Sequence, residues 1–251
     1  MATQKGVIKL EGAVGDLSFY KRKGKYFARS KGGVSGDRIK NDPAFVRTRE
    51  NQQEFGRACS AGKLLRTSLR EAILQSKDSG MTSRLTQTIM KIIRSDSENV
   101  RGMRTISKGD IALLQGFEFN SNARLGSMFQ MEYNSVIDRA AGSVSVTVPA
   151  FVPAVMVAFP AGATHATIVA GGSEIDFEAG DFQSNVERSI SFPLDNSEQP
   201  EIMLPISLTA NTDKLIFVVL GIEFYQEVNG ANYSMKNGAF NAMALIQANT
   251  V

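Results

Sequence analysis

The second half of the chain is a succession of short strand-like runs. From Gly116 onward, alternating or wholly apolar runs are separated by Gly, Pro, Asn and Asp. They read FEFN, SMFQMEY, SVSVTVPAF, ATHATIVA, SEIDFEA, ERSISFPL, EIMLPISLTA, KLIFVVLGIEFY and AMALIQANTV. Short strands with such turns are typical of antiparallel sandwiches. Helices do not alternate with them, which disfavours a doubly wound parallel sheet. The pattern predicts an antiparallel β-sandwich of the jelly-roll or immunoglobulin-like kind over residues 111–251.

The amino-terminal residues indicate a different local structure. Polar and apolar side chains alternate around Ile8, Leu10, Leu17 and Tyr26, and glycines interrupt the alternation. Period-two alternation broken by glycine is typical of short strands joined by tight turns. We therefore expect a short β-ribbon at the start of the chain.

Two helical segments are predicted after this ribbon. Asp42 precedes a proline, and the two residue types favour a helix start because aspartate caps exposed amides and proline fits the first turn. Apolar residues then recur at helical spacing over 45–75 and over 83–94. We expect the buried face of this first segment to carry Phe55, Cys59, Leu65, Leu69, Ala72 and Ile73. The chain is thus predicted to be α+β, with a ribbon and a helical hairpin before the sandwich.

Charge divides the chain at about the same place. Residues 1–110 hold 23 Lys and Arg against 11 Asp and Glu, a net charge of +12, and residues 111–251 hold 5 against 14, a net charge of −9. Opposite charges of this size bear on association more than on fold. The sequence predicts a basic domain over 1–110 and an acidic domain over 111–251.

Composition excludes several classes of protein. Cys59 is the only cysteine, so an intramolecular disulfide framework and a multi-cysteine zinc site are excluded. No apolar run approaches the roughly 20 residues of a membrane-spanning helix. The first residues lack the apolar core of a signal peptide, so we expect synthesis in the cytoplasm without one.

Candidate catalytic and cofactor-binding patterns are weak. His165 is the only histidine, and Glu174 or Asp176 would have to orient it as a general base. The segment KGGVSGDR at 31–38 lacks the Lys-Ser/Thr ending of a phosphate-binding loop. We therefore expect no enzymatic activity, no cofactor and no small-molecule substrate.

The acidic segment SEIDFEAGDF at 173–182 raises the question of calcium. It carries Glu174, Asp176, Glu178 and Asp181, but neither possible register places glycine sixth, as an EF-hand loop requires. On a strand, the first three acids would share one solvated face. No metal site is predicted, although calcium at 174–181 stays an open alternative.

The ribbon concentrates positive charge beside aromatic residues. Its candidate contact residues are Lys21, Arg22, Lys23, Lys25, Tyr26 and Arg29. Phosphate groups attract such cations, and exposed aromatic rings stack on bases. Charges at the tip of a hairpin are also commonly just solvated. A nucleic-acid-binding module is therefore the alternative prediction for this segment.

Part of the chain resembles a known family. DPAFVRTRENQQEFGRACSAGKLLR at 42–66, following GDLSFYKRKGKYFARSKGGV, is similar to an uncharacterised bacterial protein family over residues 10–120. The resemblance implies no activity, cofactor or site. The β-rich remainder resembles generic sandwich modules of phage-like and other self-assembling particles.

Charged residues within the family-like segment lie at helical spacing. Arg47 and Glu50 form one opposite-charge pair and Glu54 and Arg57 another, with Arg49 beside them. The arrangement fits an ordinary charged helix face, and it could also lock the helix against another subunit's ribbon. Arginine is suited to the second role because its planar fork makes two parallel hydrogen bonds.

These observations together predict a structural role. A bipolar chain can associate basic half to acidic half, and a head-to-tail contact closes into rings or propagates as filaments. A two-stranded ribbon is marginal alone in water and needs a surface to bind. We therefore expect a self-assembling subunit of a ring, tube, filament or particle, bound to copies of itself or to related subunits.

Overall fold

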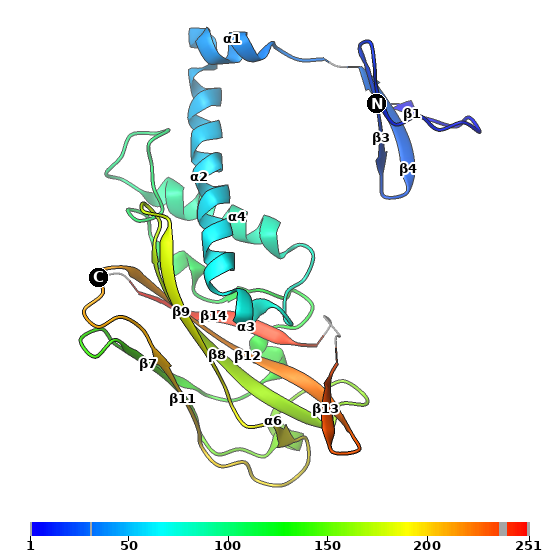
Figure 1. Ribbon diagram of the computed structural model, residues 1–251. Coiled ribbons are helices and arrows are strands. Elements are labelled where there is room, and N and C mark those ends of the chain that lie inside the picture. The colour runs from blue at the N-terminus through cyan, green and yellow to red at the C-terminus, as the bar shows by residue number, and fades with distance from the viewer. Residues whose placement is uncertain (1, 31, 236–239, 250–251) are drawn as a thin grey trace. The chain divides into compact units, whose positions relative to one another are not determined.

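The computed structural model of the chain describes residues 2–30, 32–235 and 240–249 (Figure 1). Contacts divide the chain into two compact units, Met1–Glu50 and Asn51–Val251. We call them the amino-terminal unit and the main unit.

The amino-terminal unit contains a small antiparallel sheet. Its strands are β1 (Ala2–Thr3), β2 (Gly12–Val14), β3 (Leu17–Arg22) and β4 (Lys25–Ser30), in the order β1-β4-β3-β2. We call this the amino-terminal sheet. The predicted ribbon is present at β3 and β4, whereas Ile8 and Leu10 lie outside the strands and are exposed.

Two short helices follow this sheet along the chain and are succeeded by a long helix. They are α1 (Gly36–Asn41), the 3-10 helix η1 (Pro43–Phe45) and α2 (Val46–Ser68). The Asp42 carboxylate accepts a hydrogen bond from the Ala44 amide at 2.9 Å, so this aspartate caps η1 as the sequence predicts. This bond is the main reason that the pKa of Asp42 lies below its usual value.

Two antiparallel sheets make up most of the main unit. Within the described residues, the large sheet has seven strands, β5 and β8–β10 together with β12–β14, and the small sheet has three, in the order β11-β7-β6. The large-sheet strands are β5 (Phe117–Glu118), β8 (His165–Asp176), β9 (Asp181–Arg188), β10 (Phe192–Pro193), β12 (Leu215–Val228), β13 (Ala231–Ser234) and β14 (Ala242–Asn249). The small-sheet strands are β6 (Asn134–Asp138), β7 (Ser143–Val148) and β11 (Ile202–Ser207).

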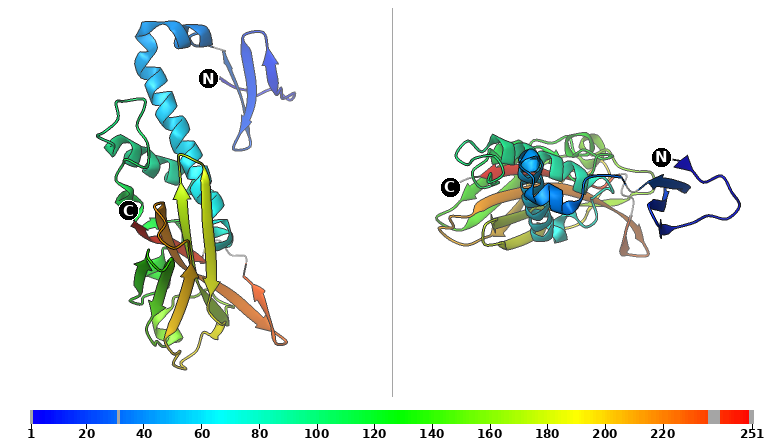
Figure 2. Two further views of the ribbon diagram at one scale, coloured as in Figure 1. Left: turned by 60° about the vertical axis from the view of Figure 1, so that its left-hand side comes forward. Right: turned by 90° about the horizontal axis from the view of Figure 1, so that it is seen from above.

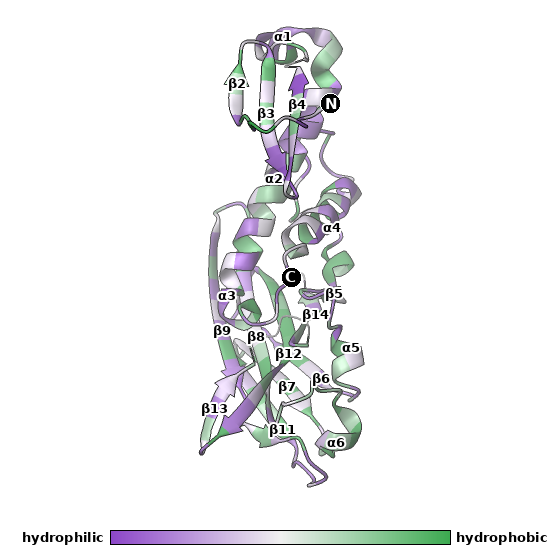
Figure 3. Cartoon of the chain, turned by 90° about the vertical axis from the view of Figure 1, so that its right-hand side faces the viewer, coloured by the Kyte–Doolittle hydropathy of each residue, from purple (hydrophilic) through white to green (hydrophobic). Residues whose placement is uncertain are grey.

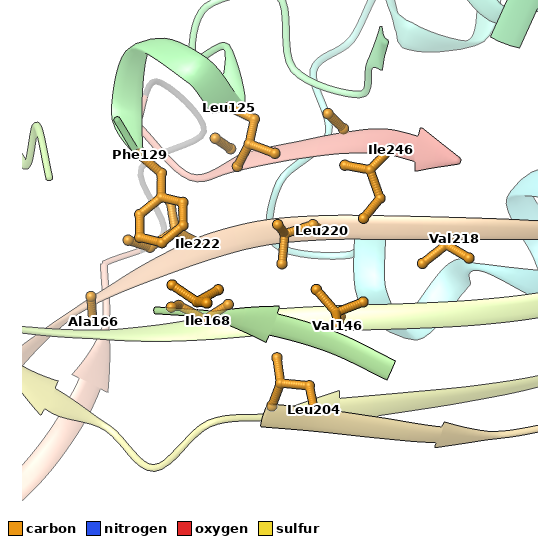
Figure 4. Packing of buried hydrophobic residues seen from close by; sticks show 14 of the residues in the cluster. Leu125, Phe129, Val146, Ala166, Ile168, Leu204, Val218, Leu220, Ile222 and Ile246 are labelled. Atoms are coloured by element: carbon orange, nitrogen blue, oxygen red, sulfur yellow. The ribbon is translucent and has the colours of Figure 1, made fainter. Parts of the chain in front are cut away.

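The long central strands of the large sheet are buried on both faces. In β12, Val218, Leu220 and Ile222 face a core shared with the small sheet, while Phe217 and Val219 face a second core. Figure 4 shows Leu220 and its neighbours opposite Val146 of β7 and Leu204 of β11. This double burial explains why β12 is almost wholly apolar from Leu215 to Ile222, and Figure 3 shows the apolar colour along part of this strand.

Helices cover the other face of the large sheet. They are the part of α2 after Glu50, α3 (Arg70–Ile73), α4 (Met81–Ser95) and the 3-10 helix η2 (Ile111–Leu114). Further short helices, α5 (Leu125–Met128) and α6 (Pro153–Met156), contribute to loops beside the sheets. Figures 1 and 2 show α3 and α4 on one side of the large sheet and β7 and β11 on the other.

Adjacent glycines in β8 allow both layers to approach the large sheet. A Cβ atom on Gly171 would lie 3.2 Å from Cβ of Ala72 in α3, and one on Gly172 would lie 2.9 Å from Cγ2 of Ile206 in β11. Because the side-chain direction alternates along a strand, successive glycines open opposite faces. The pair therefore sets how closely the helices and the small sheet pack.

The α+β class with antiparallel sheets is confirmed, and helices cover most of the two segments predicted at 45–75 and 83–94. The division into units differs from the expected boundary at residue 110, because the helices after Glu50 share a core with the large sheet. The expected buried face of the first helical segment is confirmed at Leu65, Leu69, Ala72 and Ile73 and is wrong at Phe55 and Cys59, which are exposed. Among the described residues, no helix has the length and apolar character needed to cross a membrane.

Candidate assembly surface

The β3–β4 hairpin of the amino-terminal sheet has a two-residue turn. Arg22 pairs with Lys25, and Lys23 and Gly24 between them have φ angles of 48° and 76°. Positive φ at both central residues gives the turn the twist that a hairpin needs, and glycine adopts it without strain. The turn therefore fixes the register of the hairpin and projects Lys23 at its tip.

This register separates the hairpin into two faces. Opposite residues share a face, so one face carries Leu17, Phe19, Lys21, Tyr26, Ala28 and Ser30, and we call it the apolar face. The other carries Ser18, Tyr20, Arg22, Lys25, Phe27 and Arg29, and we call it the basic face. Val14 of β2 lies opposite Leu17 and extends the apolar face. The candidate cations of the ribbon thus fall mainly on the basic face and at the tip.

Cations already contact the aromatic rings of the hairpin. On the basic face, the rings of Tyr20 and Phe27 stack with centroids 5.8 Å apart, and the Arg29 guanidinium lies 5.8 Å from the Tyr20 centroid. On the apolar face, Lys21 Nζ lies 5.3 Å from the Tyr26 centroid. These contacts hold aromatic side chains in place on both faces of the hairpin.

The amino-terminal unit has no buried core. None of its described residues is buried, and apolar side chains such as Ile8 and Val14 are 81% and 65% exposed. Sheets gain stability mainly by burying one face, and small strand pairs are marginal without such burial. Burial of the apolar face would therefore add to the stability of this sheet.

The charged residues of α2 contact their own chain. Arg49 Nη1 donates to the carbonyl oxygens of Ile39 and Asp42, at 2.7 and 3.0 Å, and Arg47 pairs with Glu50 at 3.0 Å. The sequence singled out Arg49 and Arg47 as candidates for contact with another subunit, and in the structure each has a partner in its own chain.

Glu54 and Arg57 bind the loop that follows α4. Glu54 Oε1 accepts from the Gly102 amide at 2.8 Å, and Arg57 Nη1 donates to the carbonyl oxygens of Gly102 and Arg104 at 2.5 and 3.2 Å. Glu54 is only 2% exposed, so this carboxylate is buried beneath the loop. Sequence reasoning recognised both residues as important and missed their partners, which lie more than 40 positions later.

His165 lies in a polar cluster at the start of β8. Its Nε2 is 3.2 Å from a carboxylate oxygen of Glu227, and its Nδ1 is 3.0 Å from the hydroxyl of Thr164. That hydroxyl also accepts from the Glu227 amide at 2.7 Å. The three side chains tie the ends of β8 and β12 together, and none of them lines the cleft along α2 described below.

The carboxylates of the acidic segment at 174–181 have separate partners and do not form one cluster. Glu174 is buried and accepts from the amide and the hydroxyl of Thr209, whereas Asp176 accepts from amides of its own turn and Asp181 pairs with Lys214 at 3.1 Å. The turn amides lower the pKa of Asp176. Among the described residues, no three His, Cys, Asp or Glu side chains are placed to hold a metal ion.

A cleft of about 820 Å³ runs along α2 of the main unit. Its lining comes from one side of α2, from Ile93, Thr105 and Ile106, and from the β8–β9 turn at Phe177, Glu178 and Gly180. The lining of the cleft mixes amide, hydroxyl and apolar side chains. Its charged residues are Arg57, Lys63 and Glu178. The cleft has the size of a ligand site.

Asp96 organises the loop that covers Glu54. This carboxylate is 2% exposed and accepts from the amides of Glu98, Asn99 and Thr105 and from the Asn99 side chain, all between 2.9 and 3.0 Å. Burial alone would raise the pKa of Asp96, but these hydrogen bonds outweigh it and lower the pKa to about 2.

Acid should therefore loosen this loop. Because the folded-state pKa of Asp96 is depressed, its contribution is present above pH 4 and is lost as pH falls toward 2, and it amounts to about 2 kcal/mol. Urea unfolding of wild type and Asp96→Asn should show a difference in free energy that shrinks over this range. The exposed Asp213→Asn serves as the control. A difference that stays constant from pH 6 to pH 2 would contradict the assignment.

The chain was also compared with known proteins. No protein-family model, no curated protein sequence and no solved structure matches it.

Proposed function

We propose that the protein is a non-enzymatic structural subunit that assembles with copies of itself through the amino-terminal sheet. The observation that carries the proposal is the apolar face of that sheet, in a unit where no described residue is buried. A surface of this kind gains free energy when another surface covers its apolar side chains.

Charge favours a second copy as the covering partner. Residues 1–50 hold 12 Lys and Arg against 5 Asp and Glu, a net charge of +7, while residues 111–251 carry −9. A contact between the amino-terminal sheet of one copy and the acidic β-rich part of the next is electrostatically complementary. Because the two surfaces differ, the contact is head-to-tail and generates a ring, tube or filament. The finer fold assignment, a jelly-roll or immunoglobulin-like sandwich as in particle-forming proteins, stays a prediction that the antiparallel pairing supports.

Light scattering and electron microscopy of the purified protein test this proposal. We expect full-length protein to form oligomers at low salt, and deletion of residues 1–35 to leave monomers. Phe19→Asp, on the apolar face, should also disrupt assembly because it places a charge where apolar contact is needed. Ser18→Asp adds the same charge to the basic face of the same strand and should retain assembly.

A full-length protein that remains monomeric at high concentration and low salt would refute self-assembly. The amino-terminal sheet would then be covered by its own chain or by another molecule. Equal loss of assembly in Ser18→Asp and Phe19→Asp would refute the apolar face as the contact, while leaving the sheet itself implicated.

A nucleic-acid-binding module is the second candidate, favoured by the basic face. Tyr20 and Phe27 form a stacked pair flanked by Arg22, Lys25 and Arg29, and such surfaces bind single strands by stacking and charge. It ranks second because nucleic acid would leave the apolar face uncovered. In the same preparations, a gel shift with a single-stranded oligonucleotide should weaken steeply as salt rises if this candidate holds. The absence of a shift at low salt would remove it.

A further inference from the structure

Apolar side chains are exposed on the main unit at and just after α6. Val155, Met156 and Phe159 are all exposed, Val155 by 66%, and we call these three side chains the α6 patch. The backbone beneath them is fixed, because the Met156 carbonyl accepts from the Gln130 amide and the Ala158 amide donates to the Met128 carbonyl, both at 2.8 Å. Large apolar side chains held close together at a surface are typical of contact sites.

An acidic segment lies beside this patch. The Ala154 amide of α6 donates to the Asp195 carbonyl at 2.9 Å, and Phe151 exchanges two backbone hydrogen bonds with Gln199. These contacts place residues 195–201 next to α6, beyond the ends of β7 and β11 (Figure 1). The segment carries the exposed acids Asp195, Glu198 and Glu201. The α6 patch therefore has a negatively charged border.

The wider stretch of chain that contains the patch is also acidic. Residues 140–213 hold nine Asp and Glu against one Lys or Arg, a net charge of −8. The one cation, Arg188, pairs with Glu71 at 2.8 Å. An acidic surface of this kind attracts a cationic partner and repels an anionic one.

We propose that the α6 patch receives the apolar face of the amino-terminal sheet of a second copy. This inference rests on the proposed function, and it names the acceptor surface of that contact. The apolar face offers Val14, Leu17 and Phe19, with Lys21 on the same face and Lys23 at the hairpin tip. The contact sets apolar side chains against apolar side chains and lysines against the acidic border.

The combination of an apolar centre and an acidic border selects this partner over two others. The phosphates of a nucleic acid and the headgroups of anionic lipids would both meet like charge at residues 195–201. The amino-terminal sheet supplies apolar side chains and cations on one face, so a second copy satisfies both parts of the patch. Because each copy carries one donor sheet and one acceptor patch, the contact repeats from copy to copy.

A mixing experiment tests the assignment. Phe19→Asp disables the donor sheet, and Val155→Asp disables the acceptor patch at an exposed position where the fold tolerates a charge. We expect each variant alone to be monomeric. An equimolar mixture should form a heterodimer of about twice the monomer mass, because the sheet of the Val155→Asp copy still binds the patch of the Phe19→Asp copy. Size-exclusion chromatography with light scattering measures these masses.

The matched control is Val100→Asp. Val100 is also exposed on the main unit, in the loop between α4 and η2, so the control adds the same charge at the same residue type away from the patch. It should assemble as wild type does. Glu198→Lys/Glu201→Lys, which reverses the charge of the border, should disrupt assembly at low salt. Circular dichroism checks that every variant is folded.

The outcomes separate this inference from the proposed function. Assembly of Val155→Asp to the wild-type mass, while Phe19→Asp is monomeric, would refute the α6 patch and leave self-assembly through the sheet intact. Monomeric Val155→Asp that forms no heterodimer with Phe19→Asp, or equal loss of assembly in Val100→Asp, would also overturn the assignment. A monomeric wild-type protein would refute both proposals together.

Discussion

A single methyl group added at Gly221 is expected to lower the free energy of unfolding by about 3 kcal/mol or more. Gly221 lies in the middle of β12 and pairs with both Val169 of β8 and Met243 of β14. A Cβ atom at this position would lie 2.3 Å from the carbonyl oxygen of Ala242 and 2.6 Å from Cε of Met243. A methionine side chain can move, but the backbone of a central strand cannot move without breaking its ladder. Gly221→Ala should therefore fold poorly or not at all.

The matched substitution is Gly56→Ala. Gly56 is exposed on α2, and a Cβ atom there meets nothing within 4 Å. Alanine restricts the unfolded chain and favours helix, so this variant should gain about 0.5–1 kcal/mol. Urea unfolding followed by circular dichroism measures both variants. A Gly221→Ala protein with wild-type stability would contradict the tight β12–β14 approach described above.

Phe217→Ala is expected to cost 3–5 kcal/mol and to destabilise the helices together with the large sheet. Phe217 is fully buried in the core that α2, α3 and α4 share with the sheet, and its ring meets that of Phe177 edge-to-face at 5.9 Å. Removing the ring leaves a cavity bordered by both layers. Since the helices and the large sheet share one core, neither layer can unfold without exposing the buried apolar residues of the other.

Calorimetry of the full-length chain measures this coupling. We expect the main unit to unfold in one transition, in wild type and variant, with the calorimetric and van't Hoff enthalpies in agreement. Phe182→Ala, which removes the same ring from a 39% exposed position on β9, should change stability much less. Separate transitions for helices and sheet, with only the sheet shifted by Phe217→Ala, would instead support the domain boundary near residue 110.

Local sequence determined the elements whose geometry depends on near neighbours. The β3–β4 hairpin follows from strand alternation around Lys23 and Gly24, and the start of η1 follows from the capping by Asp42. The antiparallel class follows from short strands with frequent turn residues. In each case, the deciding interactions lie within a few residues, so the pattern of residue types was sufficient to predict the structure.

Tertiary structure decided which faces are buried and which charged groups meet. On α2, the buried face carries Ala58 and Ala61 rather than Phe55 and Cys59, because α4 packs closely enough to require small side chains there. Gly62 shows the same approach, since a Cβ atom on it would lie 3.3 Å from Cδ1 of Ile89. A periodic pattern of apolar residues predicts a helix, but a partner far along the chain selects the side that it covers.

The small cavity lined by Glu54, Arg94, Arg101 and Arg104 was outside the reach of sequence reasoning for the same reason. Glu54 belongs to α2, Arg94 to the end of α4, and Arg101 and Arg104 to a loop whose path depends on Asp96. No spacing rule connects these positions, because the loop is placed by hydrogen bonds to groups more than 40 residues away. Sequence alone supplied the excess of basic residues in the first half of the chain. Only the fold gathers three of them around one buried carboxylate, since convergence of charge is a property of distance in space and not of distance along the chain.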